Sequence, residues 1–367
     1  MLKQYKLKNY KFTLIFLVAA LTILGILLIG SAQPDVQKKQ ILGFAAGLVI
    51  MLIVSVIDYS FILKFSWLIY LFMVGILALV RLMGDSSGGA QRWFEIGSFR
   101  FQPSELAKIL LILFFAYYFF KHEEKINTPR VLLGSFVLAG IPLYLIVNQP
   151  DLSTTIVTAL IFAAMLFVAG ISYKLVIGVL AVSIPSFFVV MSLVIQGNFP
   201  LLQGFQSNRI MAWLYPDDYP DLAYQQQNSI MAIGSGQLWG KGLNNTDVTS
   251  VKNGNFILES QTDFIFAVAG EELGFIGTAV IIILLLFITI ECILIARKAK
   301  DIAGKLICCG MAALIGFQSF INISVASGLM PNTGLPLPFV SYGLTSLMSL
   351  YIGIGLVLNV GLQPKKY

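Results

Sequence analysis

The feature of this sequence that most constrains its fold is a series of apolar runs, each about 20 residues long, along the whole chain. A helix of about 20 residues is long enough to cross the hydrocarbon core of a lipid bilayer. Of the 367 residues, 57% are hydrophobic and only 11% are charged, whereas about 25% are charged in an ordinary soluble domain. The chain is therefore predicted to be an all-α polytopic membrane protein.

About ten transmembrane helices are predicted, at about 12–31, 41–57, 61–81, 104–120, 131–148, 152–170, 174–195, 264–296, 304–327 and 341–361. Two connecting segments, at about 82–103 and 196–263, are too long to be simple turns, and long loops in compact proteins often carry function. We expect no appended soluble domain, so residues 1–367 are predicted to form a single membrane domain. Any chemistry should then take place at a membrane surface or between helices.

The positions of Lys and Arg predict how the chain is oriented, because cytoplasmic loops are enriched in these residues. With the N-terminus inside, the inner segments hold fifteen of the 24 Lys and Arg residues. These fifteen are Lys3, Lys6, Lys8, Lys11, Lys64, Lys121, Lys125, Arg130, Lys174, Arg297, Lys298, Lys300, Lys305, Lys365 and Lys366. An even number of spans then places both termini in the cytoplasm and both long loops outside. This orientation explains the net charge of +6, and no nucleic-acid partner is expected.

Cysteine and histidine exclude several kinds of chemistry. Cys292, Cys308 and Cys309 all lie in apolar stretches, so neither a disulfide framework nor a metal site is expected from them. His122 is the only histidine and lies in the charged run "KHEEK". Catalysis by histidine is therefore not expected.

The stretch "SQTDFIFAVAGEELGFIG" places acidic residues directly before one of the most apolar runs of the chain. Charges near a bilayer are costly, so such residues are usually paired, hydrated or functional. If a helix starts at Asp263, a strip of small residues shares its face, formed by Ala267, Gly270, Gly274 and Gly277. This strip would let another helix, or a lipid-linked ligand, approach closely. The alternative is helix packing alone, with Asp263 as a charge favoured by the helix dipole.

The first long loop and the helix after it contain the block "AQRWFEIGSFRFQPSELAK". Glu105 and Lys108 have the i,i+3 spacing of a helical ion pair. The pair is either structural or functional, although burying two charges is rarely the most favourable packing. Arg92 suits phosphate binding and Trp93 suits the headgroup level of a membrane. The alternative for each of these two residues is a membrane anchor.

The other outer segments add further polar residues. Asp151, in "NQPDLSTT", is either a functional acid or the N-cap of the sixth span. Arg209 is the only basic residue of the largest loop before Lys241. The run "GSGQLWGKG" either offers backbone amides to an anion or is simply a turn, and "MPNTGLPLPFVSYG" is an irregular connection whose backbone needs protein or water as partners. Together with Asp263 and the first loop, these segments predict a polar cavity at the outer membrane face.

In this order, the blocks "AQRWFEIGSFRFQPSELAK", "NQPDLSTT", "AIGSGQLWGKGL", "SQTDFIFAVAGEELGFIG" and "MPNTGLPLPFVSYG" resemble the SEDS family of bacterial envelope proteins, which includes RodA, FtsW and SpoVE. The resemblance extends over essentially the whole chain. It implies ten spans in the bacterial cell membrane and a peptidoglycan glycosyltransferase that polymerises the glycan of lipid II. It also implies a class B penicillin-binding protein as the transpeptidase partner. The short terminal segments favour a RodA-like role in elongation, while roles in division and sporulation stay open.

The resemblance also assigns roles to single residues. Asp263 matches the acid regarded as essential for polymerisation, so it is predicted to be catalytic. The residues predicted to bind the substrate are Arg92, Trp93, Glu105, Lys108, Asp151 and Arg209. Two departures from the family's pattern are expected to change fine detail. "SYGLTS" has Leu344 and Thr345 where members often have glycine and serine, and Gln261 stands where many have histidine.

Polymerisation joins the 4-hydroxyl of a GlcNAc to C1 of a MurNAc carried on a lipid diphosphate, so it needs one base and nearby positive charge. We expect Asp263 to take the hydroxyl proton. Arg92, Lys108 and Arg209 are expected to bind the diphosphates, and Glu105 is expected to hold Lys108. A divalent cation, Mg²⁺ or Mn²⁺, is the cofactor considered.

Two other classes of function stay open. A lipid II flippase, or another transporter, needs a polar path that reaches the inner leaflet. In this chain the charges within the spans gather on the outer side, with Glu291 as the exception. The other class is a non-catalytic scaffold for a transpeptidase, which would show no activity in isolation.

Overall fold

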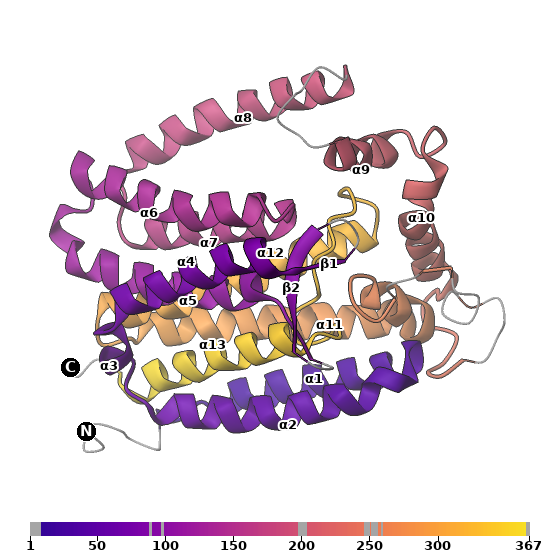
Figure 1. Ribbon diagram of the computed structural model, residues 1–367. Helices are drawn as coiled ribbons and strands as arrows, with labels where there is room; N and C mark the ends of the chain where they lie inside the picture. The colour runs from indigo at the N-terminus through magenta and orange to yellow at the C-terminus, as the bar shows by residue number, and fades with distance from the viewer. Residues whose placement is uncertain are drawn as a thin grey trace.

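The computed structural model describes residues 9–87, 90–96, 99–196, 204–245, 250, 256–257 and 260–364. Within these residues, ten apolar helices form the body of the molecule (Figure 1). They are α1 (Phe12–Ala32), α2 (Pro34–Val56), α4 (Ser66–Met83), α5 (Pro103–Lys121), α6 (Pro129–Val147), α7 (Leu152–Val168), α8 (Tyr173–Ile195), α11 (Ile265–Arg297), α12 (Ile302–Ala326) and α13 (Leu344–Leu362). Eight are long and apolar enough to cross a membrane, and α4 and α7 are shorter apolar helices. The predicted polytopic helical membrane fold is confirmed, with one helix at each predicted span.

Three spans differ from the prediction in where they begin or how they continue. The third, predicted from residue 61, starts at Ser66 as α4 and is preceded by the short helix α3 (Tyr59–Leu63). α2 starts at Pro34 rather than near residue 41. Proline suits the first turn of a helix, and the acid Asp35 in that turn is favoured by the helix dipole. α11 is interrupted at Gly274, where a φ of 64° and a ψ of −164° are not helical. The predicted eighth span therefore consists of two helical segments that meet at Gly274.

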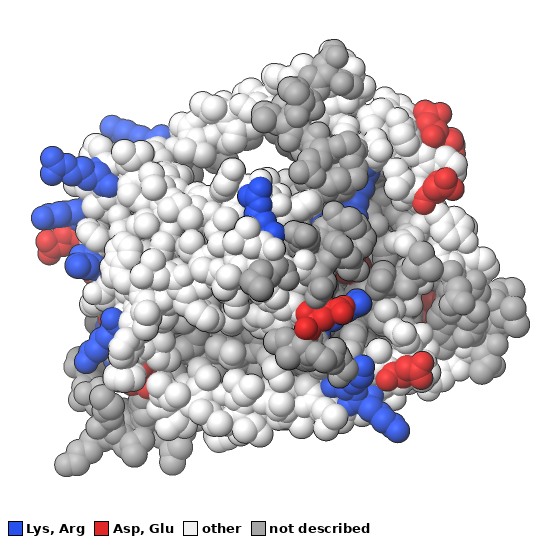
Figure 2. Space-filling model, in the orientation of Figure 1, with Lys and Arg blue, Asp and Glu red and all other residues white. Residues whose placement is uncertain are grey.

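The two ends of the bundle carry different elements. The terminal end carries the short helices α3 (Tyr59–Leu63) and η3 (Glu123–Lys125), and Asn9 and Pro364 line the same cavity there. The opposite end, called the loop end here, carries the two long connections (Figure 1). Figure 2 shows Lys and Arg side chains projecting from the terminal end, while most of the visible Asp and Glu lie toward the loop end. This distribution is the one that cytoplasmic termini would produce, and the orientation itself stays a prediction.

Both long connections contain regular elements. The first holds a small antiparallel sheet of β1 (Asp85–Ser87), β2 (Ala90–Ile96) and β3 (Phe99–Phe101), in the order β1-β2-β3. The second holds the helices α9 (Gly204–Leu214) and α10 (Pro220–Ser235). The sheet departs from the prediction of an all-α chain. Its aromatic residues favour strands, and Glu95 on β2 pairs with Arg100 on β3 at 2.7 Å.

The helices α5, α12 and α13 form the interior of the bundle, because most residues of their spans are buried. α2 packs along α13 at two glycines. Gly43 lies against Leu344, and Gly47 lies against the ring of Tyr351. A side chain at either position would collide with α13, so the small-residue pair on α2 serves helix packing.

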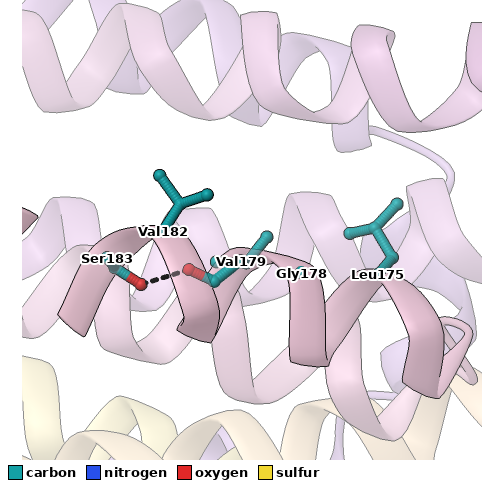
Figure 3. Close-up of a pocket in the computed structure, with 5 residues that line it drawn as sticks. All are labelled: Leu175, Gly178, Val179, Val182 and Ser183. Atoms are coloured by element: carbon teal, nitrogen blue, oxygen red, sulfur yellow. Dashed lines mark hydrogen bonds between the residues drawn. The ribbon is translucent and has the colours of Figure 1, made fainter. Parts of the chain in front are cut away.

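Helix α8 lies at the periphery, and Val194 is the one buried residue among those of α8 whose burial the structure describes. A cavity of about 480 Å³ beside it is lined by Leu175, Gly178, Val179, Val182 and Ser183 (Figure 3). Ser183 Oγ donates to the carbonyl of Val179 at 2.5 Å, so the lining presents an almost wholly apolar surface. Such a surface suits contact with lipid tails, and this cavity is not the predicted polar site.

Candidate functional site

Asp263 lies at the loop end, directly before the N-cap of α11. The helix starts at Ile265, one residue after the predicted start of the eighth span and two residues after Asp263. The side chain is half-buried. One wall of its surroundings is the irregular connection 331–343, because a Cβ at Gly334 would lie 3.3 Å from Asp263 Oδ2. The segment that the sequence identified as irregular thus lies against the carboxylate.

Arg209, on α9, is the cation that shares this region with Asp263. Burial lowers the pKa of Arg209, and the positive charge of Arg92 acts in the same direction. The negative charges of Asp263 and Asp151 oppose both effects. Interactions of this kind require the charges to be near one another. The structure therefore brings together four of the residues that the sequence predicted for the site.

Two neighbouring cavities meet at Arg209. One, of about 40 Å³, has Arg92 and Arg209 in its lining together with Ser153 and Thr333. The other, of about 220 Å³, lies between α9 and α10 and also includes Arg209 and Asn332. Arg209 Nη1 lies 3.5 Å from the carbonyl of Asn332. Two guanidinium groups therefore line a small cavity at the loop end whose remaining lining is largely apolar, and Arg209 also lines the larger and more polar cavity beside it.

Arg92 and Trp93 are neighbours on β2, but only Arg92 lines the cavity. Successive side chains of a strand point to opposite faces, which separates the two. Arg92 Nε donates to the carbonyl of Gln149 at 2.9 Å, and Arg92 Nη2 donates to that of Pro150. The small sheet is thereby attached to the turn between α6 and α7. A guanidinium has five N–H donors, so these two bonds leave capacity for an anion.

Asp151 caps α7, which is the sixth span. Its carboxylate accepts a hydrogen bond from the backbone N–H of Thr154 at 3.1 Å, and its side chain is only 3% exposed. The N-cap interpretation is therefore confirmed. Because the same carboxylate acts electrostatically on Arg209, the cap also adds negative charge to the site.

Glu105 and Lys108 form the ion pair that their spacing predicted. Lys108 Nζ donates to Glu105 Oε1 at 2.7 Å and to Gln318 Oε1 on α12 at 2.7 Å. Their side chains are 3% and 1% exposed. In this structure the ammonium group therefore contacts protein on two sides. Substrate binding by Glu105 and Lys108 stays a prediction.

The glycine-rich turn "GSGQLWGKG" occupies the face of α11 on which the sequence predicted an open strip. Gly236 and Gly240 of this turn lie directly against the backbone of α11 at Gly270 and Gly274. Neither pair leaves room for a side chain. The prediction that another helix approaches this strip closely is confirmed at Gly270, where Ile233 of α10 lies against it. The turn that follows α10 fills the strip as far as Gly274 and leaves no room for a lipid-linked ligand there.

The turn also supplies the hydrogen bonds that the break in α11 requires. Phe275 N donates to Gln237 O at 2.8 Å, and Lys241 N donates to Glu271 O at 2.9 Å. Lys241 Nζ adds an ion pair with the buried carboxylate of Glu271 at 2.9 Å. An irregular backbone at membrane depth is stable only when protein or water satisfies it. The amide of Lys241 is thus used inside the protein, which favours a structural turn over an anion site.

Gly274→Ala is expected to destabilise the protein strongly. The backbone conformation at Gly274 alone would cost about 1–3 kcal/mol in any other residue. In addition, the new Cβ would lie 2.7 Å from the carbonyl oxygen of Leu238. The test is thermal unfolding of the purified protein in detergent. Gly140→Ala, in the interior of α6 with no atom within 4 Å of the added Cβ, is the control, and equal unfolding midpoints would contradict this expectation.

The helices α9 and α10 are attached to the C-terminal end of α12, where helix carbonyls lack partners within the helix. Gln226 and Ser229 on α10, and Trp213 on α9, donate to backbone carbonyls within residues 325–330 at 2.7 to 2.8 Å. The sequence analysis missed these residues. The polar run "QQQNS" indicated that hydrogen-bonding side chains lie on this helix. Which carbonyls they bind depends on the tertiary packing and could not be predicted. These bonds fix α9, and with it Arg209, relative to α12.

Leu344 and Thr345, two of the three positions that depart from the family's pattern, have defined contacts. Thr345 Oγ1 donates to the carbonyl of Arg100 at 3.1 Å and lies 3.3 Å from the backbone N–H of Gln102. Leu344 fills the groove at Gly43 on α2. Both residues therefore contribute to packing at the start of α13.

A divalent cation is not indicated by a cluster of ligands. Within the part of the chain that the structure describes, there is no group of three or more His, Cys, Asp or Glu residues that could hold a metal ion. Asp151 and Asp263 are the acids near Arg209, and one of them is already used as a helix cap. Mg²⁺ or Mn²⁺ stays a prediction.

The fold and the site define a polytopic membrane protein with a charged cavity at one end of its helix bundle. The chain belongs to the FtsW/RodA/SpoVE family, described as cell cycle proteins, whose sequence profile it matches over residues 4–366. It is 34% identical to the peptidoglycan glycosyltransferase MrdB of Escherichia coli, over 96% of this chain and 94% of MrdB. It is 32% identical to the probable peptidoglycan glycosyltransferase FtsW of Geobacter sulfurreducens, over 98% of this chain and 97% of that protein.

Solved structures show the same fold. A chain from a peptidoglycan synthase complex, studied for the coordination of polymerization and crosslinking, aligns with a TM-score of 0.79 and 29% identity, over 96% of this chain and 97% of that chain. The crystal structure of the rod shape determining protein RodA of Thermus thermophilus aligns with a TM-score of 0.69 and 28% identity, over 96% of both chains. The resemblance inferred from the sequence blocks is confirmed.

Proposed function

We propose that this protein is a peptidoglycan glycosyltransferase that polymerises lipid II into glycan strands at the outer face of the bacterial cell membrane. The observation that carries the proposal is the half-buried carboxylate of Asp263 at the loop end, near two arginines that line a shared cavity. The relatives named as peptidoglycan glycosyltransferases support the same activity.

The reaction needs a base for one hydroxyl and positive charge for one leaving group. Asp263 takes the proton from the 4-hydroxyl of the acceptor GlcNAc. The resulting oxygen forms a bond to C1 of the donor MurNAc, and the bond between C1 and the lipid diphosphate breaks with both electrons going to the diphosphate. Because this is a single displacement, the α-linked donor gives a β-linked product. The polyprenyl tail stays in the bilayer throughout.

Arg209 and Arg92 are the groups that bind the departing diphosphate. Guanidinium groups bind phosphate oxygens in a bidentate manner, and both side chains line the same cavity. Lys108 has a supporting role and does not contact the substrate, because its ammonium already donates to Glu105 and Gln318. Trp93 anchors the small sheet at the membrane surface, and Asp151 holds the start of α7 next to the arginines.

Arg209→Ala is expected to raise the KM for lipid II by about tenfold or more, since one charged hydrogen-bonding partner of the diphosphate is lost, a contribution of about 1.5–3 kcal/mol. The measurement is the initial rate of glycan polymerisation as a function of lipid II concentration. Arg100→Ala is the matched control, because Arg100 lies on the outer sheet with its side chain 63% exposed. Equal kinetics for the two variants would contradict diphosphate binding by Arg209.

A lipid II flippase is the second candidate. A flippase needs polar groups that continue to the inner leaflet. Glu291, near the C-terminal end of α11, is the one observation in its favour. The buried ion pair Glu105–Lys108 and the partly exposed pair Glu271–Lys241 instead lie near the starts of α5 and α11, at the loop end. Movement of labelled lipid II across vesicles without formation of polymer would favour the flippase. A non-catalytic scaffold would neither move lipid II across the vesicle membrane nor form polymer.

A class B penicillin-binding protein is the proposed partner, and cytoplasmic termini are the proposed orientation. The structural similarity to a chain of a peptidoglycan synthase complex supports such a partner. The proposal is compatible with a role in elongation or in division. Co-purification of the full-length chain with the transpeptidase encoded in the same organism tests the partnership.

A further inference from the structure

We propose that Asn322 on α12 and Ser341 in the connection 331–343 are positioning residues that hold Asp263 in place for proton transfer. This inference rests on the proposed function, because it takes Asp263 to be the base. It concerns the short segment 261–263 that leads into α11. The two buried side chains act on catalysis through the position of Asp263 and do not contact the substrate.

Consecutive carbonyls of this segment accept hydrogen bonds from side chains on two other elements. The carbonyl of Asp263 accepts from Asn322 Nδ2 at 2.8 Å, and the carbonyl of Thr262 accepts from Ser341 Oγ at 2.6 Å. Because the two bonds hold neighbouring peptide groups, they fix both the position of the segment relative to α12 and the rotation of its backbone about the chain direction. The direction in which the side chain of Asp263 leaves the backbone is thereby determined.

A third bond comes from the backbone itself. The N–H of Tyr342 donates to the carbonyl of Gln261 at 2.9 Å. All three carbonyls of 261–263 are therefore bound from outside the segment, and two of the three donors come from adjacent residues of one connection. The connection and the segment behave as one unit in which Asn322 and Ser341 provide the side-chain bonds.

Asn322 also fixes the wall that faces the carboxylate. Its Nδ2 donates to the carbonyl of Leu335 at 2.6 Å as well as to that of Asp263. Leu335 follows Gly334, the residue nearest to Asp263 Oδ2 among the connection's glycines. One amide group thus sets the spacing between the acid and the wall beside it. With a side chain 1% exposed, Asn322 is out of reach of a substrate.

Gln318 extends this arrangement one helical turn along α12. Its Nε2 donates to the carbonyl of Pro336 at 2.9 Å, next to the residue that Asn322 binds. Residues four apart lie on the same face of a helix, so Gln318 and Asn322 hold consecutive carbonyls of the connection. Because the other end of the Gln318 amide accepts from Lys108, the buried ion pair is tied to the same connection.

The test compares four variants in purified full-length protein with lipid II as substrate. Asn322→Ala and Ser341→Ala are expected to lower kcat by about 10- to 100-fold, since small displacements of a base have effects of this size. The KM is expected to stay within about twofold, because the arginines that bind the diphosphate are unchanged. Ser341→Thr keeps the hydroxyl and is expected to restore kcat.

Asn359→Ala is the matched control for Asn322→Ala. Asn359 is a fully buried asparagine on α13, and its Nδ2 donates to the carbonyl of Ser55 at 2.8 Å. It lies toward the terminal end, so its loss removes the same kind of bond far from Asp263. The kcat of Asn359→Ala is expected to equal that of the unchanged protein.

The outcomes separate this inference from the proposed function. If the unchanged protein makes no glycan strands, the proposed function fails. If the unchanged protein is active and both Asn322→Ala and Ser341→Ala keep full kcat, the inference is overturned while the function stands. An equal loss of kcat in Asn359→Ala also overturns it. If Asn322→Ala does not fold, Ser341→Ala and its rescue by Ser341→Thr decide the question.

Discussion

Asp263→Asn is expected to lower kcat for glycan polymerisation by about 10²–10⁴-fold, the contribution typical of a positioned base. Asparagine has nearly the same size but does not accept the proton of the acceptor hydroxyl. The bond from Asn322 to residue 263 uses the backbone carbonyl, so the substitution leaves it in place. The fold is therefore expected to persist, and the loss should lie in kcat rather than in KM.

The measurement is the rate of strand formation by purified protein at saturating lipid II. Asp218→Asn is the matched control, because Asp218 is an exposed acid in the turn between α9 and α10. Its rate is expected to equal that of the unchanged protein. A well-folded Asp263→Asn protein that forms strands at the normal rate would remove Asp263 as the base.

Lys108→Met is expected to lower the free energy of unfolding by about 3–5 kcal/mol, the cost of leaving one member of a buried ion pair without its partner. The carboxylate of Glu105 is 3% exposed and bonds to Lys108 Nζ at 2.7 Å. Replacing both members, as in Glu105→Leu with Lys108→Met, is expected to recover much of this loss. Gln318 Oε1 loses the same bond in both proteins, so the comparison isolates the buried charge.

Unfolding in detergent, followed by temperature or denaturant, provides the measurement. Arg100→Met breaks the exposed pair with Glu95, whose side chains are 63% and 44% exposed, and is expected to cost only about 0–1 kcal/mol. If Lys108→Met retains full stability and nevertheless fails to use lipid II, the ammonium acts on the substrate directly. That result would replace the supporting role proposed here.

The helices and their order could be predicted from the sequence because the signal is local. Apolar runs of sufficient length fix each span, and the i,i+3 spacing of Glu105 and Lys108 was enough to predict their ion pair. The N-cap at Asp151 was also open to prediction, since an acid before "LSTT" suits a helix start. In each case the residues involved are close together in the chain.

The contacts between distant segments could not be predicted in the same way. The sequence around Gly274 predicts a continuous helix, with no local sign of the break. The break is stable because a turn about 35 residues earlier in the chain supplies its hydrogen bonds. Asn322 lies in an apolar span with no local sign that it binds two carbonyls outside its helix. Buried polar residues in a membrane helix are the general signal, but their partners depend on the tertiary structure.

The most direct test of the central claim is to give lipid II to the purified chain alone, without a penicillin-binding protein, and to separate the products by length. The account predicts glycan strands from the unchanged chain and none above background from Asp263→Asn. Lipid II that crosses a bilayer but is never polymerised, or strands that form at the same rate from both proteins, would contradict it.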